Sequence, residues 1–152
     1  MNFRALLAGI AALLIVACNP IENINQTEVR IAKFERLYSS GDVDALYGMT
    51  GKAWRDVSTR EEFDDLHRIV STRLGKVTAS ERTNFNINTN NGLTTTVIVM
   101  ETEFEQGQGT QTFTFQGNGE EMELVGWNVN SPRLAITVDD LQDREAEPAE
   151  AE

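Results

Sequence analysis

The 152-residue sequence has little of the chemistry on which metal-binding, disulfide-stabilised and most catalytic proteins depend. It contains one cysteine and one histidine. A single cysteine excludes an internal disulfide, so packing alone must hold the fold together. One histidine among scattered carboxylates is not a recognisable metal-ligand set. We therefore expect no metal, no cofactor and no catalysis.

Basic residues are also scarce. The chain has 13 Lys and Arg against 24 Asp and Glu, which gives a formal net charge of −11. This balance repels phosphate backbones and argues against a nucleic-acid partner. Residues 139–152 hold seven of the acids and one leucine, which predicts a disordered acidic tail. We expect the tail to keep the protein soluble; the alternative is recognition of a basic partner.

The sequence lacks an apolar run long enough to cross a membrane. The longest run extends from Ala5 to Ala17 and contains a glycine, whereas a membrane-spanning helix needs about 20 apolar residues. The run follows Arg4 and ends in small residues, as is typical of a secretory signal peptide. We therefore assign residues 1–17 to a signal peptide.

The only cysteine stands directly after this run. Ile15-Val16-Ala17-Cys18 resembles the bacterial lipobox. The resemblance implies cleavage between Ala17 and Cys18, a diacylglycerol on the thiol, and a fatty acid such as palmitate on the new amino group. Two or more acyl chains give a stable membrane anchor. The alternative is an ordinary signal peptide with an unmodified Cys18.

The residue after the cysteine bears on location. Asn19 stands where aspartate would retain a lipoprotein in the inner membrane, in the enteric bacterial pattern. We therefore expect a lipid-anchored protein of the bacterial cell envelope, in the outer membrane and facing the periplasm. Residues 18–24 would form a lipidated tether to a domain that spans residues 25–138.

Three helices are predicted at the start of this domain. Asn25 and Glu28 form a capping-box-like pair, which predicts a helix from Asn25 to about residue 38. Asp42 is placed to cap a short helix over residues 43–49. After a connection over residues 50–57, Ser58 and Glu61 predict a second capping box. A third helix follows over residues 59–74, and Gly75 is its expected left-handed stop.

From Lys76 the apolar period changes to two, which indicates strands. Asn91-Gly92 and Asn118-Gly119 predict two-residue type I′ hairpin turns. The first turn places Ile87 opposite Thr96 and Phe85 opposite Ile98; the second places Phe113 opposite Leu124 and Phe115 opposite Met122. We expect an α+β fold in which three N-terminal helices pack on a four-stranded antiparallel meander. Residues 134–138 are a candidate edge strand.

Several short motifs, in this order and spacing, resemble a bacterial family known as domain of unknown function 4019. They are Ser40-Gly41-Asp42, Trp54, Ser58-Thr59-Arg60-Glu61-Glu62-Phe63, Arg73-Leu74-Gly75-Lys76-Val77, Ser80-Glu81-Arg82 and Val125-Gly126-Trp127-Asn128-Val129. The resemblance spans about residues 28–131. It implies export and a cystatin-like or nuclear transport factor 2-like fold, but no reaction. Tyr47 and Phe63 depart from the family pattern, which usually has tryptophan at both positions.

A few side chains are candidates for function. His67, with a nearby acid such as Asp64, could act as a general base in an enzyme of the nuclear transport factor 2-like kind, although a core histidine is the ordinary alternative. Trp54 and Trp127, with Tyr47 and His67, are candidate ligand-binding residues for a sugar, peptide or lipid tail. The alternative for both tryptophans is the hydrophobic core.

Three apolar residues do not fit the predicted covered face of the sheet. Leu93, Val97 and Val99 alternate with the residues expected to face the helices. If helices cover only one face, these side chains are exposed and favour an envelope protein partner, a homodimer or a small apolar ligand. Our leading hypothesis is therefore a lipid-anchored, non-catalytic binding domain. A structural envelope subunit that dimerises through its sheet is a further alternative.

Overall fold

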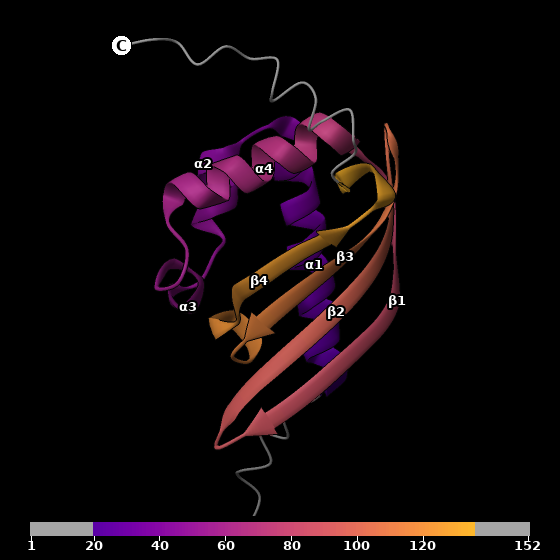
Figure 1. Cartoon of the computed structure of the whole chain (residues 1–152). Helices are drawn as coiled ribbons and strands as arrows, with labels where there is room; N and C mark the ends of the chain where they lie inside the picture. The colour runs from indigo at the N-terminus through magenta and orange to yellow at the C-terminus, as the bar shows by residue number, and fades with distance from the viewer. Residues whose placement is uncertain (1–19, 136–152) are drawn as a thin grey trace, which may run out of the picture.

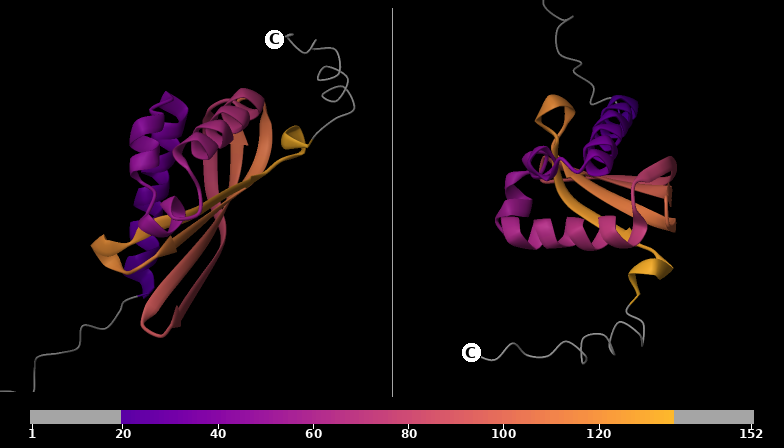
Figure 2. Two further views of the ribbon diagram at one scale, coloured as in Figure 1. Left: turned by 60° about the vertical axis from the view of Figure 1, so that its left-hand side comes forward. Right: turned by 90° about the horizontal axis from the view of Figure 1, so that it is seen from above.

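The computed structural model describes residues 20–135 (Figures 1 and 2). The predicted signal peptide, Cys18 and the acidic tail lie outside the described residues. The elements, in chain order, are α1 (Pro20–Ser40), α2 (Val43–Gly48), α3 (Lys52–Arg55), α4 (Arg60–Leu74), β1 (Val77–Asn90), β2 (Leu93–Phe104), β3 (Gly107–Gln116), the 3-10 turn η1 (Gly119–Glu121), β4 (Glu123–Asn130) and the 3-10 turn η2 (Pro132–Leu134). None of the described helices is long and apolar enough to span a membrane.

The α+β class and the antiparallel meander are confirmed, with strand order β1-β2-β3-β4. The prediction of three helices is wrong, because the described residues contain a fourth, α3, in the expected connection. Gly51 precedes α3 in an extended conformation, and its N–H donates to the Leu124 carbonyl of β4 at 2.7 Å. This contact holds one helical turn against the sheet and buries Trp54.

The predicted start of α1 is also wrong. The helix begins at Pro20, five residues before the expected cap at Asn25, so residues 20–24 are helical. Proline suits the first turn of a helix because its φ is already helical and its missing N–H has no partner there. The buried stripe of α1 includes Thr27, whose hydroxyl donates to the Ile24 carbonyl at 2.7 Å.

The capping box of α4 lies one residue later than predicted. Thr59 Oγ1 accepts from Glu62 N at 3.2 Å, and Glu62 Oε2 accepts from Thr59 N at 2.7 Å. The hydrogen bond from the Thr59 backbone is the main cause of a lowered pKa at Glu62. Ser58 does not take this role, and its N–H donates to the Trp54 carbonyl at 2.9 Å. The stop at Gly75 is as predicted, with φ +75°.

The first hairpin has the predicted register. Asn91 and Gly92 have φ values of +50° and +80°, and Ile87 pairs with Thr96. The pairing of Phe85 with Ile98 is also as predicted. Adjacent strands are antiparallel throughout, so the four strands follow one another along the chain. The register of β1 and β2 is therefore the one that the Asn91-Gly92 turn predicts.

The predicted register of the second hairpin is wrong. Phe113 pairs with Trp127, and Phe115 pairs with Leu124, because the connection is longer than two residues and contains η1. Met122 is buried at the end of this connection, which shifts the start of β4 along the chain. Of the predicted edge strand at 134–138, Leu134 belongs to η2 and residues 136–138 lie outside the described residues.

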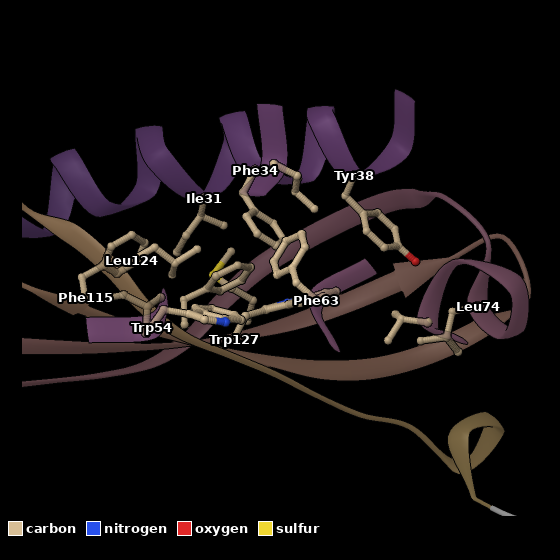
Figure 3. Packing of buried hydrophobic residues seen from close by; sticks show 14 of the residues in the cluster. Ile31, Phe34, Tyr38, Trp54, Phe63, Leu74, Phe115, Leu124 and Trp127 are labelled. Carbon is tan, nitrogen blue, oxygen red and sulfur yellow. The ribbon is translucent and has the colours of Figure 1, made fainter. Parts of the chain in front are cut away.

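The core lies between α1 and one face of the sheet. Figure 3 shows Ile31, Phe34 and Tyr38 pointing from α1 toward the strands. The Phe34 ring lies 5.3 Å from Phe113 and 5.0 Å from Trp127, as measured between ring centroids. α4 crosses near the end of the sheet where η2 lies, and closes the core there. The covered face of the sheet thus combines an apolar centre with buried polar residues, namely Thr94, Thr96, Thr102 and Gln111.

The position of the α4 cap is directly testable. Thr59→Ala should lower the free energy of unfolding by about 1 kcal/mol, because it removes the acceptor of the Glu62 N–H. Ser58→Ala is the matched control and should change this free energy by less than about 0.5 kcal/mol. Urea unfolding of both variants measures the difference. A larger loss for Ser58→Ala would contradict the cap described here.

Candidate functional site

The face of the sheet opposite α1 is not covered by any described helix. Figure 1 shows α1 passing behind the strands, with this face toward the viewer. Along β2 the residues facing the core are buried, whereas Val97 and Val99 are half-buried and Leu93 is 50% exposed. We call this surface the open face. Residues of β2 point alternately to the core and to the open face, so the strand has apolar residues on both faces of the sheet.

Polar side chains surround the two valines of the open face. Each row crosses the strands in the order β1, β2, β3, β4. The rows are Asn86–Val97–Thr114–Gly126, Asn84–Val99–Thr112–Asn128 and Glu81–Glu101–Thr110–Asn130. Threonine and asparagine can hydrogen-bond to a partner or to water. The open face is therefore better suited to a polar partner surface than to an apolar one.

One end of the open face is acidic. Glu81 and Glu101 are directly opposite each other on β1 and β2, and Glu103 lies two residues further along β2. Like charges in this arrangement destabilise a sheet. None of the ion pairs among the described residues involves these three carboxylates. Within residues 20–135, no three His, Cys, Asp or Glu side chains are grouped to hold a metal ion.

Two hollows adjoin this acidic end. The smaller, of about 470 Å³, lies over Glu81, Glu101 and Glu103. The larger, of about 860 Å³, extends from Glu101 to the turn η2 and has Arg133 on its far side. Both hollows include Gln108. The open face therefore ends in a depression with carboxylates on one side and a guanidinium on the other.

The turn η2 is held against the sheet by hydrogen bonds of the Ser131 side chain and by the close approach of the backbone at Gly109. Ser131 Oγ donates to the Gln108 carbonyl at 2.7 Å and also accepts from Arg133 N at 3.3 Å. Gly109 allows this approach, since a Cβ there would lie 2.9 Å from the Asn130 carbonyl oxygen. These contacts position Arg133 at the edge of the larger hollow.

The covered face contains a polar network that the sequence analysis did not find. Trp127 Nε1 donates to Gln111 Oε1 at 2.9 Å, and Gln111 Nε2 donates to Glu35 Oε1 at 2.8 Å and to Thr102 Oγ1 at 3.0 Å. Burial raises the pKa of Glu35, although hydrogen bonds with Ser80 and Gln111 oppose the shift. The only sequence signal was that Gln111 alternates in phase with Phe113.

His67 is mostly buried, and it also lines a hollow of about 460 Å³ together with Tyr38, Ser71 and Glu105. It is 8% exposed, and its ring meets the Tyr38 ring edge to face at 5.3 Å. Its Nε2 has no hydrogen-bond partner, and burial lowers the pKa of the ring. Asp64, the expected acidic partner, instead accepts from Arg60 Nε at 2.7 Å. The geometry of a histidine–carboxylate base is therefore not present.

The other candidate ligand-binding residues do not form one cleft. Tyr47 and Trp54 both contact Phe63, at centroid distances of 5.3 and 5.7 Å. Trp127 lies apart from them, against Phe34 and the Gln111 network. Trp54 is 6% exposed and Trp127 is 7% exposed, which favours the core alternative for both tryptophans.

Comparisons with known proteins identify no family. No protein-family model matches the chain, and no curated protein matches it. A solved structure from Bdellovibrio bacteriovorus, Bd1075, is similar at 8% identity with a TM-score of 0.45. The similarity covers 69% of this chain and 39% of that chain, so this chain spans well under half of that protein. A similarity of this size carries no argument about function.

The buried state of His67 predicts a pH dependence of stability. Its pKa in the folded chain lies below the ordinary value of 6.5, so the unfolded chain binds more protons as the pH falls through 6.5. The free energy of unfolding should therefore decrease between pH 7.5 and 5.5, and His67→Gln should reduce this decrease. Urea unfolding at both pH values measures it. The raised pKa of Glu35 contributes equally to the pH dependence of both proteins, so it cancels in the comparison. An unchanged dependence of the free energy of unfolding on pH in the variant would contradict a buried, neutral His67.

Proposed function

We propose that this protein is a non-catalytic binding domain, anchored by lipid to a bacterial envelope membrane, that binds a basic protein partner on the open face of its sheet. The observation that carries the proposal is the uncovered face with its three acidic residues, Glu81, Glu101 and Glu103, which take part in none of the ion pairs among residues 20–135. Exposed carboxylates next to half-buried valines are complementary to a partner surface that has Lys or Arg around an apolar centre.

The membrane anchor rests on the lipobox-like sequence before Cys18. In this proposal Cys18 carries the lipid, and α1 begins at Pro20. A helix that starts so soon after the anchor would keep the folded domain close to the bilayer surface. We place the protein in the outer membrane, facing the periplasm, because Asn19 follows the cysteine.

We further propose a fold of the cystatin-like or nuclear transport factor 2-like kind, and membership of the family known as domain of unknown function 4019. A long first helix packed along one face of an antiparallel meander supports the fold. The motifs quoted above support the family. Of these, Gly75 is a helix stop with positive φ, and Trp127 packs against α1, so both have structural reasons to be present.

A basic partner is favoured over a homodimer through the open face. In a two-fold dimer each copy would bring the same acidic row to the interface, and the like charges would repel. The chain as a whole has a net charge of −11, which adds to this repulsion. An enzyme that uses His67 in a pocket has less support, because the ring is only 8% exposed, its Nε2 has no hydrogen-bond partner, and Asp64 bonds to Arg60.

The open face can be tested by photo-crosslinking in the native envelope. A benzoylphenylalanine at Val97 should form a discrete adduct with one partner, and the double variant Glu101→Lys, Glu103→Lys should abolish that adduct. The control probe at Ile69, an exposed residue of α4, should not form it. Equal adducts from both positions would contradict the proposal. An adduct of twice the chain's mass would contradict a basic partner and show instead that the open face forms a homodimer.

The lipid anchor predicts that Cys18→Ser abolishes labelling with radioactive palmitate. The variant should also leave the membrane fraction or accumulate uncleaved, because its thiol can no longer be modified. Asn25→Ser changes an exposed position of α1 and should label like the unchanged protein. Labelling that survives Cys18→Ser, or membrane fractionation that stays the same, would contradict the anchor.

A further inference from the structure

Another hollow, lined by residues of α1, α3 and β4, concentrates positive charge. It has a volume of about 460 Å³ and lies among α1, the segment between α2 and α3, and the start of β4. Four of its lining residues are basic: Arg30, Lys33, Lys52 and Arg55. The chain has only 13 basic residues against 24 acidic ones. We call this site the basic hollow.

Two helices each contribute a pair of cations to the basic hollow. Arg30 and Lys33 are three residues apart on α1, and Lys52 and Arg55 are three residues apart on α3. This spacing places like charges next to each other on one helix face, which destabilises a helix. The fold then brings the two pairs to the same hollow, and an anion bound between them would offset the repulsion.

Arg55 is held in place before any ligand binds. Its Nη2 donates to the Thr50 carbonyl at 2.6 Å, and its Nε donates to Thr50 Oγ1 at 3.1 Å. The same Nη2 lies 3.3 Å from the carbonyls of Tyr47 and Gly48 at the end of α2. These contacts use Nε and Nη2 and fix the guanidinium in one orientation, so Nη1 is the donor that a ligand would meet, and little side-chain entropy remains to be lost on binding.

The acidic groups near the hollow do not neutralise it. Glu123 is the only acid among the lining residues, and its Oε2 accepts from Lys52 N at 3.2 Å. The Lys52 ammonium pairs with Asp56. No ion pair among the described residues involves Lys33. Lys33 and Arg55 therefore contribute more positive charge to the hollow than Glu123 offsets.

We propose that the basic hollow binds a phosphate group. Lysine ammonium groups and an oriented guanidinium are the side chains that proteins use for phosphate. The volume lies within the range of about 300–1,000 Å³ typical of small-ligand pockets. The phosphate could belong to a soluble compound or to a lipid headgroup. This site is separate from the open face and does not depend on its partner.

The position of the hollow bears on these two sources. An α-helix rises about 1.5 Å per residue, so Arg30 and Lys33 lie about 15–20 Å along α1 from Pro20. A headgroup of the membrane that holds the anchor would reach the hollow only if α1 lay against the bilayer. A soluble phosphate compound would reach it in any orientation.

The binding of inorganic phosphate to the full-length chain tests the site. Titration followed by NMR should shift the amide signals of residues 50–55 in a saturable manner. The double variant Lys33→Gln, Lys52→Gln should weaken binding by about tenfold or more. The control Arg68→Gln, Lys76→Gln removes two cations elsewhere and should change affinity by less than about twofold. Circular dichroism establishes that all three proteins are folded.

Vesicles distinguish the two sources of phosphate. The mature chain (residues 18–152) with Cys18→Ser, which carries neither the apolar run of residues 5–17 nor the lipid, is sedimented with vesicles of phosphatidylglycerol or of phosphatidylcholine. If the hollow takes a headgroup, phosphatidylglycerol vesicles should retain the protein and the Lys33→Gln, Lys52→Gln variant should reduce retention. If it takes a soluble compound, inorganic phosphate should bind while both vesicles give equal, low retention. The proposal is overturned if the hollow variant and its control behave alike toward both phosphate and vesicles.

Discussion

The packing of α1 along one face of the sheet is the contact on which the rest of the structure depends. Phe34 fills the centre of this interface, against the rings of Phe113 and Trp127. Beside these rings, Gln111 links Trp127 to Glu35 of α1 through buried hydrogen bonds. The apolar contacts supply most of the stabilisation, whereas the hydrogen bonds set one position of the helix along the strands, because any slip would leave buried polar groups unpaired.

This packing divides the surface into regions of different chemistry. Because α1 covers one face, the side chains of alternate residues on every strand remain on the open face, where carboxylates and threonines collect. Gly51 and Glu123 hold α3 to the start of β4. The two cations of α3 therefore line the basic hollow together with those of α1. A strongly acidic chain thereby acquires an acidic open face and a basic hollow in separate places.

The sequence predicted the kinds of element well and their ends less well. Periodicity located the long helices, and Asn91-Gly92 set the register of the first hairpin because its turn chemistry is specific. The errors arose where two local signals competed. Ser58 and Thr59 both precede a glutamate by three residues; the capping box forms at Thr59, whereas the Ser58 N–H donates to the Trp54 carbonyl. Asn118-Gly119 resembles a tight turn, but burial of Met122 favours a longer connection.

The sequence by itself determined the α+β class and the antiparallel meander, because both depend on residues that are near one another in the chain. The tertiary structure alone decided that His67 and both tryptophans are buried and that Gln111 bonds to Glu35, 76 residues away. It also decided that cations from α1 and α3 converge. Such contacts join residues whose separation along the chain carries no periodic signal, so only the packed fold specifies them.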